Sequence, residues 1–143
     1  MKIKFTGHPI IQHPSAIADV FHAILEAEPA HDKDKEHFWC AGLSTRNHIK
    51  YIELVSLGTL NSSLVHPREL FRFAIMQGTA NIICCHNHPS GDTEPSEDDL
   101  RLTARMKECG HLLGIEVLDH IIIGNNTPAT GKNYLSMKER GLI

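Results

Sequence analysis

Several features of specialised proteins are missing from this chain of 143 residues. No run approaches the roughly 18 apolar residues that a membrane-spanning helix needs, and the first residues lack the apolar stretch of a signal peptide. The four cysteines form no CxxC pair, and a chain of this length does not need disulfides. These absences predict a cytoplasmic protein with free thiols and no membrane partner.

An excess of positive charge is also missing. Lys and Arg number 14 against 17 for Asp and Glu, so the formal net charge is -3. Proteins that bind DNA through its phosphates alone usually carry a strong positive excess. The charge balance therefore argues against unaided DNA binding, and the residues Arg101, Arg105 and Lys107 remain as a basic stripe on one predicted helix.

What is present is an ordinary globular composition with one unusual count. Hydrophobic residues make up 41% and charged residues 22%, which is typical of a folded domain. The length predicts a single domain over residues 1–143. Histidine occurs 11 times, but the count alone does not separate metal ligands from surface residues.

Hydrophobic periodicity predicts strands interleaved with helices. The order predicts an α/β fold, a three-layer α-β-α sandwich around a mixed β-sheet in which a hairpin supplies antiparallel pairs. The predicted helices cover 14–29, 66–78 and 96–113, with a last helical turn at 136–141. The predicted strands cover 37–43, 48–57, 80–85, 115–123 and 134–135, with an edge strand or irregular segment at 1–14 and surface loops at 30–36, 86–95 and 125–133.

The most informative pattern follows the predicted strand 80–85. His86 and His88 are two residues apart, and in extended backbone this spacing places both rings on one side. Asp99 comes 11 residues after His88, in the first turn of the next helix. Two histidines and one carboxylate leave a fourth tetrahedral position for water, which is typical of a catalytic zinc site. So few carboxylates favour zinc over calcium or magnesium.

A simpler interpretation exists for part of this pattern. Ser96 and Asp99 are spaced as a capping box, in which both side chains only satisfy free backbone amides at a helix start. A histidine pair is also a modest signal by itself. The combination of strand, histidine pair, breaker-rich loop and Ser/Asp helix start is what favours a metal site.

The pattern H-x-H-x7-S-x2-D, filled by His86, His88, Ser96 and Asp99, resembles that of the JAMM (MPN-type) zinc metallopeptidases. From about His37 to the end, the chain is similar to RadC-like proteins of that superfamily. The segments that carry this similarity are GTLN at 58–61, VHPRE at 65–69, HNHPSGD at 86–92, LDHIIIG at 118–124 and SMKERG at 136–141.

This resemblance implies a site and a reaction. His86, His88 and Asp99 would hold one Zn²⁺ per chain, and Ser96 would hydrogen-bond the attacking water or the developing oxyanion. Glu53 matches the upstream strand glutamate of the family and would act as general base. Glu69, in a helix's first turn, is its rival. The implied fold is the JAMM, cytidine-deaminase-like sandwich, and the implied substrate is a peptide or an isopeptide-linked protein.

Two alternatives stay open beside the hydrolase. One is a DNA repair or DNA-processing factor, a label that RadC-like proteins carry; the helix-hairpin-helix segment that often accompanies it has no counterpart in residues 1–36. The other is a metal-free binding module on the same scaffold. The roles of Asp119, His120 and the loop 125–133 are also open: alternation places Asp119 and His120 on opposite faces of their strand, so at most one can contact the site.

Overall fold

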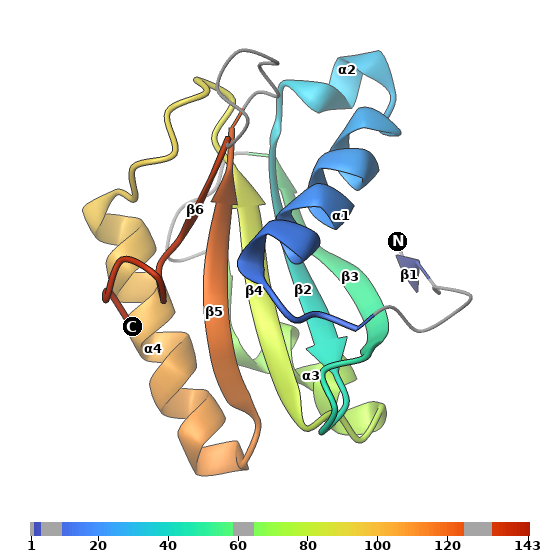
Figure 1. Ribbon diagram of the computed structural model, residues 1–143, viewed down its shortest axis with the longest axis vertical. Coiled ribbons are helices and arrows are strands. Elements are labelled where there is room, and N and C mark those ends of the chain that lie inside the picture. Colours follow the sequence, from blue (N-terminus) through green and yellow to red (C-terminus); the bar gives the residue numbers. More distant parts are fainter. Residues whose placement is uncertain (1, 4–9, 59–64, 125–132) are drawn as a thin grey trace.

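Among the residues that the structure describes, the sheet has six strands in the order β1-β3-β2-β4-β5-β6, with helices on both faces (Figure 1). The computed structural model describes residues 2–3, 10–58, 65–124 and 133–143. Its strands are β1 (Lys2–Ile3), β2 (Glu36–Leu43), β3 (Ile49–Gly58), β4 (Asn81–Asn87), β5 (Glu116–Ile123) and β6 (Tyr134–Ser136). Its helices are α1 (Pro14–Glu26), α2 (Ala30–Lys33), α3 (Pro67–Met76) and α4 (Glu97–Leu113).

The sheet is mixed, as the sequence predicts. β2 and β3 form the antiparallel hairpin, closed by a turn in which Asn47 has φ 60°, a conformation that asparagine tolerates better than most residues. β4 and β5 are parallel, joined by the crossover through α4, and the remaining pairs are antiparallel. One parallel pair inside an antiparallel sheet brings the carboxyl end of β4 beside the start of α4.

Two hydrophobic clusters hold the three layers together. On one face α1 packs on the sheet, with Phe21 and Trp39 in contact at a ring-centroid distance of 5.5 Å. On the other face α3 and α4 pack on Phe38 and Cys84, among others. Each fully buried large side chain contributes roughly 1.5 to 3 kcal/mol. The predicted three-layer α-β-α sandwich is therefore confirmed.

The predicted element boundaries need small corrections. The segment 30–36 is not a loop throughout, because residues 30–33 form the single turn α2. Pro29 precedes that turn and fixes a φ of -56°, while Asp32 lies in its first turn, where an acid is favourable. β4 continues to Asn87, so His86 lies within the strand rather than in the loop. Residues 125–132 of the predicted polar loop and 59–61 of the GTLN segment lie outside the described residues.

Candidate metal centre

The two histidines of the pair lie at the carboxyl end of β4. His86 is a strand residue, and it is fully buried against the stacked ring of Phe38. His88 comes just after the strand, but its backbone N–H still donates to Ile123 O at 2.9 Å. This bond continues the parallel pairing with β5 by one residue, so the backbone stays extended and both rings point the same way.

Asp99 reaches the same place from the first turn of α4. The helix begins with a capping box, in which Asp99 N donates to Ser96 Oγ at 3.0 Å and Ser96 N donates to Asp99 Oδ2 at 2.9 Å. The predicted capping role of Ser96 and Asp99 is therefore present. The same carboxylate also contacts both histidines, so its capping role is compatible with a role as a metal ligand.

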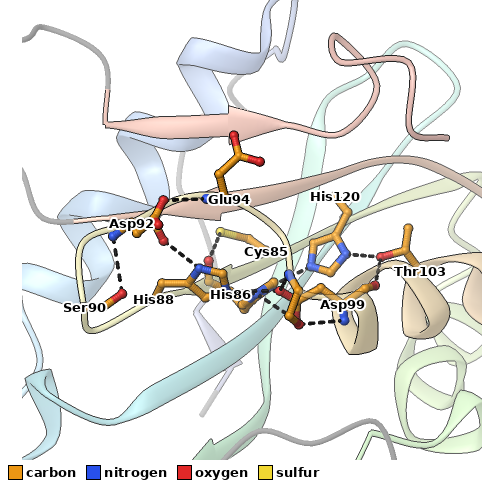
Figure 2. Close-up of polar contacts among 10 residues, drawn as sticks. Cys85, His86, His88, Ser90, Asp92, Glu94, Asp99, Thr103 and His120 are labelled. Carbon is orange, nitrogen blue, oxygen red and sulfur yellow. Dashed lines mark hydrogen bonds and ion pairs between the residues drawn. The ribbon is translucent and has the colours of Figure 1, made fainter.

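Three side chains thus converge on one point (Figure 2). His86 Nε2 lies 2.9 Å from His88 Nε2 and 3.3 Å from Asp99 Oδ1, and His88 Nε2 lies 3.1 Å from Asp99 Oδ2. Two imidazole nitrogens and a carboxylate oxygen all lie within 4.8 Å of one another. A His-His-Asp cluster of this kind can hold a metal ion.

The outward-facing nitrogens of both rings are already engaged. His88 Nδ1–H donates to the backbone carbonyl of Asp92 at 2.7 Å. His86 Nδ1 lies 2.7 Å from His120 Nε2. Metal-binding histidines commonly use their second nitrogen in this way, because the contact fixes the ring's orientation. In this cluster both Nε2 atoms face Asp99.

His120 connects the cluster to the helix. Its Nδ1 lies 2.5 Å from Thr103 Oγ1, whose hydroxyl donates to Asp99 O at 2.7 Å. His120 and Thr103 are buried on the same face of the sheet as His86 (Figure 2). The sequence left the role of His120 open. The ring contacts His86, and the only signal in the sequence was a polar residue next to the apolar run 121–123 of the strand.

Asp119, the neighbour of His120, points to the other face. Its carboxylate accepts from the backbone N–H groups of His120 at 2.7 Å and Lys138 at 3.0 Å, and from Ser136 Oγ at 2.5 Å. Burial raises the pKa of Asp119, although these hydrogen bonds oppose the rise. Asp119 therefore fixes the C-terminal turn to β5 and has no contact with the cluster.

The electrostatics of the cluster suit a cation. Burial opposes ionisation of Asp99, but the close contacts of its carboxylate with the His86 and His88 rings outweigh it and hold its pKa well below its usual range. The hydrogen bond with Asp99 raises the pKa of His88, against the effect of burial. Complete burial holds the pKa of His120 well below its ordinary value, so that ring is neutral. The cluster therefore offers the negative charge of one carboxylate to a cation bound between its two rings.

Glu53 lies on the same sheet face as the cluster but outside it. The strand register aligns Glu53 on β3 with Cys40 on β2, and Cys40 with Cys84 on β4. Glu53 is nearly buried. Burial raises the pKa of the Cys40 thiol to about 12, and the negative charge of Glu53 adds to the rise. The carboxylate therefore lies inside the protein, two strands from β4, and is not a solvent-facing residue of the hairpin.

Other candidate residues lie away from the cluster. Glu69, the rival of Glu53, is exposed on α3 with Oε1 3.8 Å from Arg68 Nε. Cys85 packs in the core on the opposite face, as strand alternation predicts. Arg101, in the predicted basic stripe, lies 3.0 Å from Asp98 and 3.8 Å from Glu97, so acidic residues of the same helix offset its charge.

The fold and the cluster together define an α/β domain with a His-His-Asp group at the carboxyl end of a central strand. The sequence profile of the RadC-like JAB domain matches residues 11–142. The chain belongs to the RadC-like JAB domain family. The match begins before His37, so it also includes α1, which carries none of the quoted motifs.

Relatives of known sequence agree with this family. The chain is 47% identical to a UPF0758 protein of Desulfitobacterium hafniense over 135 residues, which is 94% of this chain and 55% of the relative. It is 58% identical to a UPF0758 protein of Clostridium botulinum over 101 residues, 71% of this chain and 42% of the relative. The chain thus spans about half the length of the curated relatives it matches. No helix among the described residues is both long and apolar enough to cross a bilayer.

Proposed function

We propose that this protein is a zinc-dependent hydrolase of the JAMM type that cleaves an amide or isopeptide bond in a peptide or protein substrate. The observation that carries the proposal is the convergence of His86, His88 and Asp99 with both Nδ1 atoms engaged elsewhere. A cytoplasmic, reducing setting is part of the proposal, because all four cysteines are free and three of them are buried.

The donor set fits zinc. Ligand atoms 2.0 to 2.1 Å from a tetrahedral Zn²⁺ lie about 3.3 Å from one another, and the three contacts within the cluster span 2.9 to 3.3 Å. Two neutral ring nitrogens 2.9 Å apart repel one another unless a proton or cation lies between them. Zinc bound by these three residues would supply Lewis acidity and lower the pKa of a water from near 16 to roughly 7.

Two further residues would handle the proton and the oxyanion. We assign Glu53 as the general base that takes the proton of the attacking water and passes it to the leaving amine. Its burial would keep that proton from exchanging with solvent. Ser96 Oγ accepts from Asp99 N, which leaves its own O–H free to donate to the developing oxyanion. The assignment of Glu53 rests on the family pattern and on its buried position on the sheet face that carries the cluster. The assignment of Ser96 rests on the family pattern and on its hydrogen bonds with Asp99.

The test separates metal binding from catalysis. Purified protein would be assayed for zinc content and for hydrolysis of a panel of peptides and isopeptide-linked lysine conjugates. Glu53→Gln is expected to keep the zinc and lose hydrolysis by at least about 100-fold, as removal of a general base typically does. Glu69→Gln is the matched control, because it removes an exposed carboxylate from the same domain, and it should retain full activity.

Two outcomes would contradict the proposal. A protein that contains no zinc and takes up none when it is supplied would favour the binding-module alternative. Unchanged hydrolysis by Glu53→Gln would remove that residue from the mechanism while leaving the metal site intact.

A further inference from the structure

A line of buried hydrogen bonds runs from one candidate ligand back to the backbone of another. It begins at His86 Nδ1, passes through both nitrogens of His120 and the hydroxyl of Thr103, and ends at the carbonyl oxygen of Asp99. The three distances are 2.7, 2.5 and 2.7 Å. Because Asp99 also supplies a carboxylate to the cluster, the line connects two of the three metal-ligand candidates through the protein interior.

The carbonyl oxygen at the end of this line fixes which atom donates in each of its hydrogen bonds. A carbonyl oxygen can only accept, so the Thr103 hydroxyl must donate its one proton to Asp99. Thr103 Oγ1 must then accept from His120 Nδ1–H. A neutral ring with its proton on Nδ1 has a bare Nε2, which can only accept from His86 Nδ1–H. His86 is thereby left with its lone pair on Nε2, the atom that faces His88 and Asp99.

We propose that the Thr103 hydroxyl is a positioning group that selects the metal-binding tautomer of His86, acting through the ring of His120. Thr103 touches neither the metal-facing atoms nor His86 itself. Its effect comes from the order of donors and acceptors, which would reverse if its proton were not committed to Asp99. The inference rests on the proposed function, because this tautomer of His86 matters only when a metal binds at its Nε2.

The packing around His120 and Thr103 preserves this order of donors and acceptors. His120 and Thr103 are 1% and 2% exposed, so water has little access to replace a missing partner. Phe38 packs edge-on against the His120 ring and stacks on that of His86, at centroid distances of 5.5 and 6.1 Å. The backbone of α4 fixes the spacing between Thr103 and the Asp99 carbonyl, which lies one helical turn away. Buried hydrogen-bond chains of this kind lose more than one bond when one member is removed.

The first measurement is the zinc dissociation constant, obtained by chelator competition. Thr103→Val keeps the shape and removes the hydroxyl, and we expect it to weaken zinc binding by roughly 10- to 100-fold, as loss of an outer partner of a ligand typically does. Thr103→Ser restores the hydroxyl and should return the affinity to within about threefold of wild type. Met106→Leu alters the same buried helix face without touching the line, and should leave the affinity unchanged.

The second measurement reads the proton positions directly. Long-range ¹H–¹⁵N correlation spectra of the zinc-free protein, at a pH well above the pKa of His88, report which nitrogen of each ring carries hydrogen. Wild type should show His120 protonated on Nδ1. In Thr103→Val the proton should move to Nε2, because Nδ1–H no longer has an acceptor and Nε2–H can donate to His86.

Several results would overturn the inference. Wild-type His120 protonated on Nε2 would show that the line runs in the opposite direction. Equal zinc affinities for Thr103→Val and wild type, or equal losses for Thr103→Val and Thr103→Ser, would show that the hydroxyl does not position His86. The spectra need no metal, so a wild-type protein with the expected tautomer but no zinc affinity would overturn the proposed function and support the direction of the line.

Discussion

His86 and His88 face the same point but are held by different parts of the molecule. His86 is entirely buried, lies within β4 and is supported by side chains of β5 and α4. His88 is partly exposed, lies just past the strand and is supported by a backbone carbonyl of the following loop. One ligand candidate therefore depends on the packed core and the other on the conformation of a loop.

This difference indicates that the site is rigid at His86 and can move at His88. Moving the His86 ring would disturb a close-packed interior. Moving the His88 ring requires only a change in the loop, where Gly91 has φ 88° and Glu94 pairs with Arg140 at 2.8 Å. Catalytic loops are commonly carried by such a rigid scaffold. We therefore expect ligand replacement to affect the fold at His86 and only the site at His88.

The largest expected effect is the contrast between His86→Ala and His88→Ala. Both should abolish zinc binding, since each removes one of the three proposed ligands. His86→Ala should also lower the free energy of unfolding of the zinc-free protein by about 2 to 4 kcal/mol, because it leaves a cavity and removes the partner of the buried His120 Nε2. His88→Ala should cost only about 1 kcal/mol, because the ring is partly exposed and water can replace the hydrogen bonds that it leaves. Urea denaturation of both variants measures this contrast, and equal losses would contradict it.

The next effect concerns pH and belongs to His88. Its pKa is raised above 6.5 in the zinc-free fold, mainly by the hydrogen bond with Asp99. A protonated ring cannot bind metal, so zinc affinity should fall as the pH drops through that raised pKa, by about tenfold per unit for one competing proton. Chelator competition across a pH series measures the slope, and an affinity constant across that range would contradict the prediction.

The same shifts set the pH dependence of the zinc-free protein. The raised pKa of His88 contributes stability that is complete below its unfolded value of 6.5 and is lost as the pH rises through the folded value. The depressed pKa of Asp99 contributes stability that is present above 3.8 and is lost as the pH falls toward its folded value. This pair therefore stabilises the zinc-free fold most between these two limits. In His88→Asn, the free energy of unfolding of the zinc-free protein should therefore fall less than in wild type as the pH rises above 6.5.

Much of this arrangement could be predicted from the sequence. Periodicity predicts the alternation of helices and strands, and strand alternation predicts that His86 and His88 share a side while Cys85 points away. The spacing of Ser96 and Asp99 predicts the helix start. These features are local, because each depends on a few neighbouring residues.

The supports of the site could not be predicted because they depend on register and backbone. His120 reaches His86 only because β4 and β5 pair in parallel with Cys84 opposite His120, and no local pattern specifies that pairing. The support of His88 is a carbonyl oxygen of Asp92, and backbone atoms leave no residue-type signature. The short helix α2 was missed for a related reason, since one turn in a charged segment has too little periodicity to detect.

A smaller effect tests whether the loop after β4 holds the His88 ring in place. Gly91→Ala places a side chain at φ 88°, which costs about 1 to 2 kcal/mol. Relaxation of the loop would move the Asp92 carbonyl and weaken zinc binding by roughly tenfold at most, the low end for an outer partner. Gly114→Ala is the matched control, because Gly114 has φ 71° at the far end of α4. It should show the same strain in denaturation and no change in zinc affinity.

The smallest effect concerns the exposed ion pair between the loop and the C-terminal turn. Arg140 Nη1 lies 2.8 Å from Glu94 Oε1, and Asp119 fixes the backbone of that turn to β5. Exposed pairs contribute little, so Arg140→Ala should weaken zinc binding by less than about threefold. Arg101→Ala, which removes an exposed pair with Asp98 on α4, provides the control. A loss for Arg140→Ala as large as that for Gly91→Ala would mean that the C-terminal turn, rather than the loop's own backbone, holds His88 in place.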